Sequence, residues 1–384
     1  MKAVVLAAGE GRRLRPLTVL RPKPMIPVGN KPVLEHVVEA LVDAGVTELV
    51  FVVGYRRERI QTHFGDGDDW DAEIEYVVQE KQLGTGHALL QAEEKTDGEF
   101  LVVNGDSFVD SGLLAELADG KGEGTAVAVT RSDEPTDYGV VDIEDGKVVG
   151  LEEKPRVHDA ETETINAGAY RFDTRIFDDV RESSGGGEIS LTDAVVRRAE
   201  SDDVHAVYTD GWNDVSHLWD VLRVNAEKVG GKETEAGADA RGGVHSTAHV
   251  AGAVAVGRNV RVGPNATVLP GTSLGDNVRV GAGAVVANSV VFADASVGEN
   301  AVVRDCVVAG NASLGPNATV EGGKADVVVE GELYGDIRLG GVVGDNSSVG
   351  GGACLKPGTV LGNNVRVGTG TTADGRVDSG TVVR

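Results

Sequence analysis

Two glycines and three arginines lie within residues 9–16, GEGRRLRP, directly after a short apolar segment. That segment, AVVLAA at residues 3–8, is typical of a strand buried on both faces of a parallel sheet. A loop leaving the carboxyl end of such a strand lies where open α/β sheets bind ligands. Glycine lets backbone N–H groups approach a ligand closely, and the forked guanidinium of arginine fits phosphate oxygens. These residues therefore predict a binding site for a polyphosphate.

Two common phosphate-binding loops are excluded by their spacing. A Walker loop requires Gly-Lys followed by Ser or Thr, and no such triplet follows Gly9. The dinucleotide-binding fingerprint requires a third glycine three residues after the second, whereas Gly11 is followed by Arg12-Arg13-Leu14. A glycine pair alone is also typical of an ordinary tight turn after a strand, so the loop by itself leaves the chemistry open.

The segments around this loop alternate between strands and helices. Three apolar runs end in glycine or polar residues and predict further strands: 48–54, 73–79 and 99–106. Residues 31–45 predict a helix, with apolar residues at helical spacing, Pro32 in the first turn and Gly45 at the end. This alternation predicts βαβ units and a mainly parallel sheet over residues 1–228.

A hairpin and a linker complete this first part of the sequence. Asp145-Gly146 lies between two strand-like runs and predicts a hairpin turn, which adds an antiparallel part to the sheet. Residues 229–243 are rich in glycine and polar residues without periodicity, so they predict a linker between two domains.

After the linker, an aliphatic residue recurs every six positions, commonly followed by glycine. The period holds at Val250, Val256, Val262, Val268, Leu274, Val280 and Val286, returns at Val297 and Val303, then at Leu314 and Val320, and again at Val343, Val349, Leu355, Leu361 and Val367. A six-residue repeat with small residues at its corners predicts a parallel β-helix over residues 244–384. A scaffold that oligomerises and carries no chemistry would also explain this half of the chain.

The composition excludes several classes of protein. A formal net charge of −25 and a pI near 4.7 argue against nucleic-acid binding, which needs a basic face. Arginine outnumbers lysine by 24 to 12 among many acidic residues, which favours a protein adapted to high salt or an ordinary acidic protein. The only cysteines, Cys306 and Cys354, indicate neither a disulfide framework nor a zinc site. No run approaches the roughly 20 apolar residues of a membrane span, so we expect a cytoplasmic protein.

Seven segments in the first 228 residues closely resemble the sugar-1-phosphate nucleotidyltransferases. They are LAAGEGRRLRPLT, RPKPMIPVGNKPVLEH, QEKQLGTGHAL, VVNGDS, YGVVDIEDGKVVGLEEKP, INAGAYRF and WNDVSHLWDV. The repeats after them extend the resemblance to the archaeal, N-acetylglucosamine-1-phosphate uridylyltransferase-like subgroup. The resemblance implies an α/β fold, with a Rossmann-like nucleotidyltransferase domain followed by a left-handed parallel β-helix of hexapeptide repeats.

The resemblance also implies a reaction between two anions. A sugar 1-phosphate oxygen attacks the α-phosphorus of a nucleoside triphosphate, and pyrophosphate leaves, so catalysis rests on positioning and charge neutralisation. Arg13 and Lys23 match the catalytic cations of the family, whereas Arg12 departs from the small residue usual at its position. The positions that match nucleotide contacts are Leu6, Ala8, Gly9, Gly11, Gln79, Gly84 and Thr85.

Two carboxylates and four further residues complete the implied site. Asp106 and Asp214 match the family's ligands of Mg²⁺, although a lone Asp at a strand end is more often a helix cap. The positions that match sugar or sugar-phosphate contacts are Gly139, Glu153, Lys154 and Asn166. The segment QLGTGHA is most similar to the uridylyltransferase version, which favours UTP over dTTP, with glucose or N-acetylglucosamine 1-phosphate as the other substrate.

The β-helix departs from the bifunctional relatives that also acetylate an amino sugar phosphate. Aligned by eye, Glu299, Val302 and Ser313 stand where that motif has His, Tyr and Asn. Acetyl transfer needs a base that titrates near neutral pH, so we predict no acetyltransferase activity. The β-helix is then expected to be a scaffold that forms a trimer.

Three alternatives stay open beside this interpretation. The chain could be a bifunctional enzyme that uses acetyl-CoA, a silent sensor of nucleotide sugars, or a purely structural trimer. Silent members tend to lose the loop arginine, the lysine or a metal carboxylate, and all of these are present here. A structural trimer would leave the phosphate loop unexplained.

Overall fold

The structure is a computed structural model that describes residues 1–120, 124–156, 162–183, 187–201, 203–230 and 243–384. The chain forms two compact units. The first unit comprises Met1–Glu10, Pro22–Met25 and Val33–Asp214, and the second comprises Gly11–Arg21, Ile26–Pro32 and Val215–Arg384. The expected linker, 229–243, falls mostly on residues outside the described ones, and the boundaries at 228 and 244 stay a prediction.

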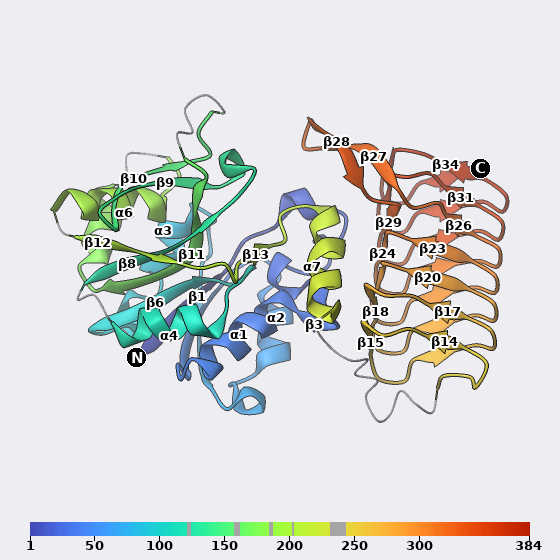
Figure 1. Ribbon diagram of the computed structural model, residues 1–384, viewed down its shortest axis with the longest axis horizontal. Coiled ribbons are helices and arrows are strands. Elements are labelled where there is room, and N and C mark those ends of the chain that lie inside the picture. The colour runs from blue at the N-terminus through green and yellow to red at the C-terminus, as the bar shows by residue number, and fades with distance from the viewer. Residues whose placement is uncertain (121–123, 157–161, 184–186, 202, 231–242) are drawn as a thin grey trace. The chain divides into compact units, whose positions relative to one another are not determined.

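The first unit is built on a nine-stranded mixed sheet with the order β5-β4-β1-β6-β11-β8-β12-β10-β9 (Figure 1). The strands are β1 (Lys2–Ala7), β4 (Glu48–Val53), β5 (Glu73–Val78), β6 (Glu99–Asn104), β8 (Thr125–Arg131), β9 (Gly139–Glu144), β10 (Lys147–Glu153), β11 (Thr164–Asp173) and β12 (Val204–Tyr208). Strand β1 pairs in parallel with both β4 and β6, so the predicted parallel core is confirmed. Strand β11 runs antiparallel to β6 and joins this core to the antiparallel pair β9–β10.

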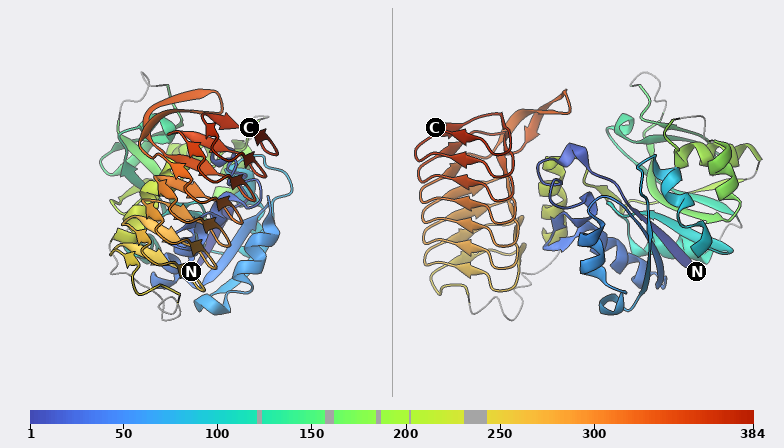
Figure 2. Two further views of the ribbon diagram at one scale, coloured as in Figure 1. Left: turned by 90° about the vertical axis from the view of Figure 1, so that its right-hand side faces the viewer. Right: turned by 180° about the vertical axis from the view of Figure 1, so that it is seen from behind.

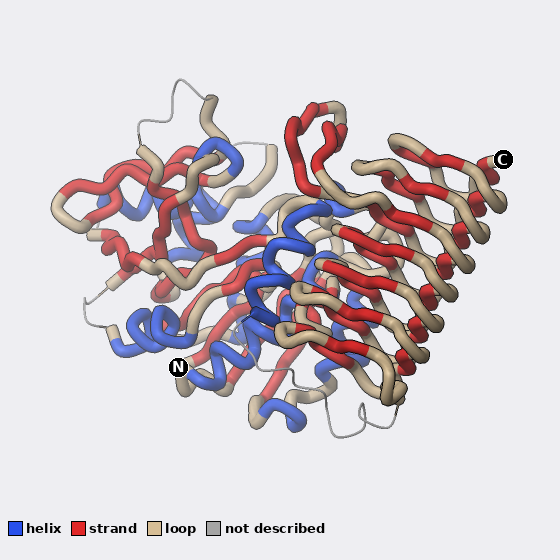
Figure 3. The backbone as a smooth tube through the Cα atoms, turned by 45° about the vertical axis from the view of Figure 1, so that its right-hand side comes forward, coloured by secondary structure: helices blue, strands red, loops and turns tan. Residues whose placement is uncertain are grey.

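Helices cover both faces of this sheet (Figure 3). They are α1 (Val33–Asp43), α2 (Arg57–Phe64), α3 (Thr85–Leu90), α4 (Ser111–Asp119), α5 (Ile176–Glu182) and α6 (Leu191–Ser201). Ala3 and Val5 of β1 share an apolar cluster with α1, α2 and α4, whereas Val4 and Leu6 share another with α3, α5 and α6. Because successive strand side chains point to opposite faces, a strand covered on both sides must be apolar throughout, as residues 3–8 are.

Two local predictions are confirmed and one is corrected. The turn at Asp145-Gly146 has φ values of 49° and 80°, as a two-residue hairpin turn requires. Gly45 follows helix α1 with φ of 80°. Pro32 does not lie in the first helical turn, because it belongs to the short strand β3 (Lys31–Pro32), which pairs with β2 (Pro27–Val28).

The second unit contains the predicted parallel β-helix, with three seven-stranded sheets whose coils stack in parallel layers (Figure 2). Sheet I contains β15 (Val254–Val256), β18 (Thr272–Leu274), β21 (Val290–Val291), β24 (Cys306–Val308), β29 (Gly341–Val343), β32 (Thr359–Leu361) and β35 (Arg376–Val377). Sheet II contains β16 (Arg261–Val262), β19 (Arg279–Val280), β22 (Ser296–Val297), β25 (Ser313–Leu314), β30 (Ser348–Val349), β33 (Arg366–Val367) and β36 (Val382–Val383). Sheet III contains β14 (His249–Val250), β17 (Thr267–Val268), β20 (Val285–Ala287), β23 (Val302–Arg304), β26 (Thr319–Val320), β31 (Cys354–Leu355) and β34 (Thr372–Ala373).

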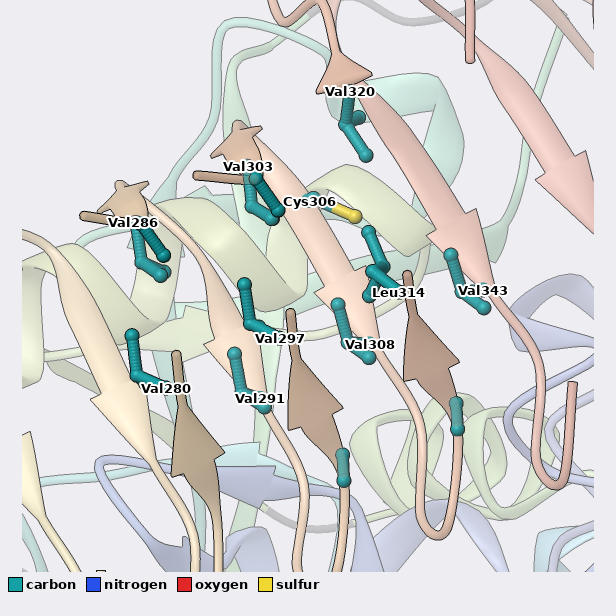
Figure 4. Packing of buried hydrophobic residues seen from close by; sticks show 14 of the residues in the cluster. Val280, Val286, Val291, Val297, Val303, Cys306, Val308, Leu314, Val320 and Val343 are labelled. Atoms are coloured by element: carbon teal, nitrogen blue, oxygen red, sulfur yellow. The ribbon is translucent and has the colours of Figure 1, made fainter. Parts of the chain in front are cut away.

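The six-residue series fills the core of the β-helix (Figure 4). Breaks in the series have two causes. Some coils are one residue shorter, and there Val291 and Val308 supply the inward side chain. After Val320, a hairpin of β27 (Lys324–Val329) and β28 (Glu332–Arg338) is inserted before the next coil. The core is therefore continuous where the sequence period is not.

Asparagine, as well as glycine, makes the corners of the coils. Nine asparagines in the β-helix have positive φ values: Asn259, Asn265, Asn277, Asn288, Asn300, Asn311, Asn317, Asn346 and Asn364. The left-handed region is tolerated by Asn better than by other side-chain-bearing residues, because its short polar side chain can hydrogen-bond locally. The prediction of small residues at the corners missed this use of asparagine.

Helix α7 (Leu218–Gly230) packs on sheet I of the second unit (Figure 1). Its fully buried Asn225 donates from Nδ2 to the Gly271 carbonyl at 2.8 Å and accepts at Oδ1 from the Ser273 hydroxyl at 2.6 Å. The same oxygen accepts from the Gly29 backbone N–H at 2.9 Å. One buried amide therefore links the helix, the β-helix and the segment 26–32.

The remaining short elements are β7 (Ser107–Phe108), β13 (Asn213–Asp214) and the 3₁₀ helices η1 (Arg12–Leu14), η2 (Lys23–Met25), η3 (Asp68–Trp70), η4 (Glu93–Lys95) and η5 (Pro135–Asp137). Within the described ranges, no helix combines the length and the apolar character needed to span a bilayer.

Strand β25 offers a matched pair of side chains for testing the core of the β-helix. Leu314 points into the core and is 2% exposed, whereas its neighbour Ser313 points outward. Leu314→Ala should lower the free energy of unfolding by about 2–5 kcal/mol, because it removes buried methyl groups and leaves a cavity. Ser313→Ala should change it by less than about 0.5 kcal/mol. Urea denaturation followed by circular dichroism measures both, and equal losses would contradict the assigned core.

Candidate active site

Two carboxylates and one ammonium meet where strand β6 ends. The Lys23 Nζ lies 3.0 Å from the Asp106 Oδ2 and 3.2 Å from the Asp214 Oδ1. Asp106 follows β6, and Asp214 is brought beside it because β13 pairs antiparallel with β7, with Asp214 opposite Ser107. The side chains of Lys23 and Asp214 are only 14% and 7% exposed, whereas that of Asp106 is 34% exposed. The cluster is thus anchored in the unit and open on the side of Asp106.

The electrostatics of the cluster keep Lys23 charged. Burial by itself lowers the pKa of Lys23, but the charges and hydrogen bonds of Asp106 and Asp214 outweigh burial and raise the pKa well above its ordinary value. One ammonium with two carboxylates leaves a formal charge of −1. The cluster can therefore attract a further cation, which would lie near the Lys23 ammonium.

The donor set suits a magnesium ion that is shared with phosphate. Mg²⁺ prefers hard oxygen ligands and is commonly held by one or two carboxylates together with water and substrate phosphates. Asp106 and Asp214 converge on one ammonium and provide these oxygens. Among the described residues there is no group of three or more His, Cys, Asp or Glu side chains that could hold a metal. The residues present therefore fit a shared ion and do not form a cage made by the protein alone.

The carboxyl end of β1 presents backbone rather than side chains. The Leu6 carbonyl accepts a hydrogen bond from the Gly105 N–H at 2.9 Å. The Ala8 carbonyl accepts one from the Gln82 side-chain amide at 2.8 Å. At Gly9, no described atom lies within 4 Å of the position that a Cβ would take, so there is room beside its backbone. Gln82 lies inside a quoted motif, but its contact with Ala8 was not predicted.

Gly11 and Arg13 belong to the second unit. Gly11 has φ of 65° and precedes η1, and its carbonyl accepts hydrogen bonds from the Leu14 N–H at 3.1 Å and the Thr18 hydroxyl at 2.8 Å. Arg13 is half-buried and Arg12 is exposed. The roles of Gly11 and Arg13 in phosphate binding stay predictions.

Gln79, Gly84 and Thr85 form one tightly packed turn. The buried Gln79 donates from Nε2 to the Gly84 carbonyl at 3.1 Å, and the same nitrogen lies 3.0 Å from the His87 Nδ1. Gly84 has φ of 102°, and a Cβ there would lie 2.4 Å from the Ile189 carbonyl oxygen. The Thr85 hydroxyl accepts from the Leu191 N–H at 3.1 Å. The structure thus brings these three predicted residues together and gives each a packing role as well.

The predicted sugar-binding residues lie on neighbouring strands. Gly139 of β9 is paired with Glu153 of β10, and a Cβ at Gly139 would lie 3.1 Å from the Glu153 Oε2 and 3.6 Å from the Asn166 Cβ. Lys154 is exposed and its backbone N–H donates to the Tyr138 carbonyl at 2.9 Å. Three of the four residues are therefore close neighbours around Gly139.

Tyr170 is a partner of this group that the sequence did not indicate. Its hydroxyl accepts a hydrogen bond from the Asn166 Nδ2 at 2.6 Å, while the Asn166 Oδ1 accepts one from the Gly168 N–H at 3.0 Å. Burial raises the pKa of Tyr170 well above its ordinary value, so the hydroxyl stays protonated. Strand β11 bulges between Asn166 and Tyr170, which directs both side chains to one place.

Comparison with family models covers most of the chain. Residues 2–229 match the model described as nucleotidyl transferase. Residues 250–334 match the GMPPB C-terminal domain, and residues 342–373 match the hexapeptide repeat of succinyl-transferase. The first match contains every predicted site residue, and the other two fall on the β-helix.

Similar proteins point the same way. The bifunctional protein GlmU of Methanococcus maripaludis is 33% identical, covering 97% of this chain and 95% of its own length. The glucose-1-phosphate thymidylyltransferase of Streptomyces antibioticus is 33% identical, covering 77% of this chain and 88% of its own. A solved structure from Bacillus anthracis, assigned as a glucose-1-phosphate thymidylyltransferase in complex with a sucrose, has a TM-score of 0.55 and 28% identity over 59% of this chain and 94% of its own. The chain therefore belongs to the sugar-1-phosphate nucleotidyltransferases, in which a nucleotidyltransferase domain is here followed by a hexapeptide-repeat β-helix.

Proposed function

We propose that this chain transfers a uridylyl group from UTP, with dTTP as the second choice, to glucose 1-phosphate or N-acetylglucosamine 1-phosphate in the cytoplasm. The products are a nucleotide sugar and pyrophosphate. The observation that carries this proposal is the meeting of Lys23 with Asp106 and Asp214 beside the backbone at the end of β1. That arrangement offers both charge neutralisation and oxygen ligands where a triphosphate needs them.

In this mechanism the chain's own residues position two anions for attack. The Lys23 ammonium, held by its two carboxylates, lowers the repulsion between the sugar phosphate and the α-phosphate. Arg13 stabilises the charge that develops on the triphosphate in the transition state. The open backbone at Gly9 lets N–H groups approach the phosphates. Asp106 and Asp214 would hold Mg²⁺, which supplies Lewis-acid neutralisation of phosphate oxygens when bound.

The Gln79–Gly84 turn is the proposed reader of the base. The hydrogen bond from the Gln79 amide to the Gly84 carbonyl sets the orientation of this side chain before a base arrives. Uracil and thymine present the same pairing edge and differ by one methyl group, so the turn suits both. One methyl group is worth only about 1–3 kcal/mol of discrimination. The methyl group alone therefore accounts for no more than about a 200-fold preference, and any larger preference for UTP over dTTP would come from contacts to the 2′-hydroxyl of the ribose.

The proposed sugar site uses side chains that hydrogen-bond hydroxyl groups. Glu153 supplies a carboxylate and Asn166 supplies an amide, and both lie around Gly139, where a side chain would crowd them. Lys154 supplies a positive charge for the sugar phosphate. The Asn166 amide is held by Tyr170 and Gly168, so its orientation is fixed as well.

The direct test measures pyrophosphate release with Mg²⁺ over a grid of nucleoside triphosphates and sugar 1-phosphates, at low and at multimolar KCl. Lys23→Met, Asp106→Asn and Asp214→Asn should each reduce kcat by about 100-fold or more, because each removes charge aimed at the phosphates. Asp110→Asn is the matched control. Asp110 lies four residues after Asp106 but caps helix α4 through the Leu113 N–H at 2.9 Å.

The control variant should keep its activity within about twofold, because Asn also caps helices well. Folded wild-type protein that releases no pyrophosphate with any pair at either salt would contradict the enzyme. Binding of a nucleotide sugar without turnover would then support the sensor.

The bifunctional alternative is favoured by one observation, the high coverage of a relative named as bifunctional. On the β-helix, an open groove of about 800 Å³ along sheet II is lined by Arg261, Arg279 and Glu299, among others. We keep the proposal that no acetyl transfer occurs, because Glu299 is an acid where the motif has an imidazole. Incubation with acetyl-CoA and glucosamine or galactosamine 1-phosphate should release no free CoA thiol. Release that Glu299→Gln abolishes would establish the bifunctional enzyme.

We also propose that the β-helix forms a trimer through sheet III. One row of outward residues across its five central strands carries no charge: Thr267, Val285, Val302, Thr319 and Cys354. Arg304, at the end of β23, is exposed beside this row. Sheet II has arginines at the equivalent outward positions of several strands. Sedimentation velocity should show a trimer that Val302→Glu dissociates, because like charges would meet at the interface. Ser313→Glu, on the same coil but on sheet II, should leave it intact, and a monomeric wild type would refute the interface.

A further inference from the structure

The loop that carries Arg13 is bound to the β-helix by a half-buried arginine, Arg21. Residues 11–21, here called the arginine loop, belong to the second unit. At the end of this loop, the Arg21 Nη2 contacts the Asp345 Oδ1 in an ion pair. Its other terminal nitrogen, Nη1, donates back to the Leu17 carbonyl at 3.3 Å. The guanidinium also lies over the ring of Phe292, 4.8 Å from its centroid.

Hydrogen bonds within the β-helix hold Asp345 in position for its contact with Arg21. Asp345 lies at the corner between β29 and β30, with its side chain 3% exposed. The Gly310 N–H donates to the same Oδ1 at 3.1 Å, and the Asp345 N–H donates to the Asn363 Oδ1 at 2.8 Å. A Cβ at Gly310 would lie 3.2 Å from that carboxylate oxygen and 3.6 Å from the Arg21 Nη2. A buried carboxylate is costly without a counter-charge, and Arg21 supplies it.

Two further side chains of the β-helix hold the same loop. Arg376 of β35 donates to the Arg15 carbonyl at 3.1 Å. Asn363 donates to the Pro16 carbonyl at 3.4 Å. Together with the bond to Leu17, three successive carbonyls of the arginine loop accept from side-chain donors. These carbonyls begin two residues after Arg13.

We propose that Arg21 and Asp345 are positioning residues for nucleotidyl transfer, and that the β-helix sets the geometry of the arginine loop. This inference rests on the proposed function, because it assumes that Arg13 acts on the triphosphate. A glycine-containing loop has many conformations, and only some of them place the Arg13 guanidinium where it can bind the triphosphate. Fixing the carbonyls next to Arg13 removes that freedom before substrate binds. The β-helix is then part of the nucleotidyltransferase machinery as well as a scaffold.

The expected effect is on turnover more than on sugar binding. A displacement of about 1 Å in a positioning group can lower a rate about 100-fold. Arg21→Met and Asp345→Asn should each lower kcat by roughly 10- to 100-fold. The KM for the sugar 1-phosphate should stay within about threefold, because the proposed sugar residues Glu153 and Asn166 lie on the other unit.

The experiment compares these variants, in the chain of residues 1–384, with variants of a second Arg–Asp pair on the same β-helix. The control is Arg338–Asp305, where Nε lies 3.0 Å from Oδ1. Its Asp side chain is 5% exposed, close to the 3% of Asp345, while its Arg side chain is 71% exposed, so the two Asp→Asn variants are the matched comparison. Arg338→Met and Asp305→Asn break a similar contact away from the arginine loop. Both pairs should lower the melting temperature, whereas only the Arg21–Asp345 variants should lower kcat.

Three readouts separate positioning from stability. The double variant Arg21→Met/Asp345→Asn should be no slower than either single variant, because both remove one interaction. Arg21→Lys, which retains the charge, should recover part of the rate. Deuterium exchange of peptides within residues 9–21 should be faster in Arg21→Met and unchanged in Arg338→Met.

Three other outcomes would show whether the positioning role or the proposed function is wrong. If the wild type is active and Arg21→Met loosens residues 9–21 without lowering kcat, the positioning role is wrong and the proposed function stands. If Arg338→Met lowers kcat equally, the effect is one of general stability and the positioning role is again wrong. If the wild type transfers no nucleotide at all, the proposed function fails and the positioning role fails with it.

Discussion

The buried ammonium of Lys23 is the constraint on which the first unit depends. A charge with so little access to water persists only when it is compensated, and Asp106 and Asp214 compensate it from segments almost 110 positions apart in the chain. The pairing of β7 with β13, beside Lys23, brings the two carboxylates together. The short helix η2, the turn after β6 and the strand before α7 are thereby held together. The proposed substrates, both anions, need this combination of fixed positive charge and oxygen ligands.

The second unit follows a different physical rule, since its stability comes from repetition. Each coil adds inward aliphatic side chains to one continuous column, while asparagine or glycine closes its corners. Outward side chains lie outside this column, and their chemical character differs between the three sheets. Helix α7 packs on β15, β18, β21 and β24 of sheet I. Sheet II carries arginines, and sheet III has an uncharged row through Thr267, Val285 and Val302. Because the inward side chains form the core, the outer surface of the β-helix can contact other segments, among them residues 11–21.

The sequence predicted the local and periodic features of both units. Strands β1, β4, β5 and β6, the hairpin at Asp145-Gly146 and the β-helix all follow from patterns within one element or one repeat. The family resemblance supplied the carboxylates, which no local pattern separates from helix caps. It could not supply the partners of Arg21 or Asn225, because contacts across 324 or 196 residues leave no periodicity. Tyr170 was missed for a related reason: its contact with Asn166 depends on a bulge in β11.

The segment of residues 11–32 is divided between the two units of the chain. Residues 22–25, which carry Lys23, belong to the first unit, whereas the segments on either side, 11–21 and 26–32, belong to the second. Arg21 and Asn225 are among the residues that hold these two flanking segments. Within the second unit, the anchored residues 11–21 have less freedom than a free loop, so less conformational entropy would be lost if Arg13 binds a triphosphate as proposed. In a reaction that depends on positioning two anions, a smaller loss of conformational entropy raises the rate. The β-helix thus has a physical reason to accompany a nucleotidyltransferase even if it performs no chemistry itself.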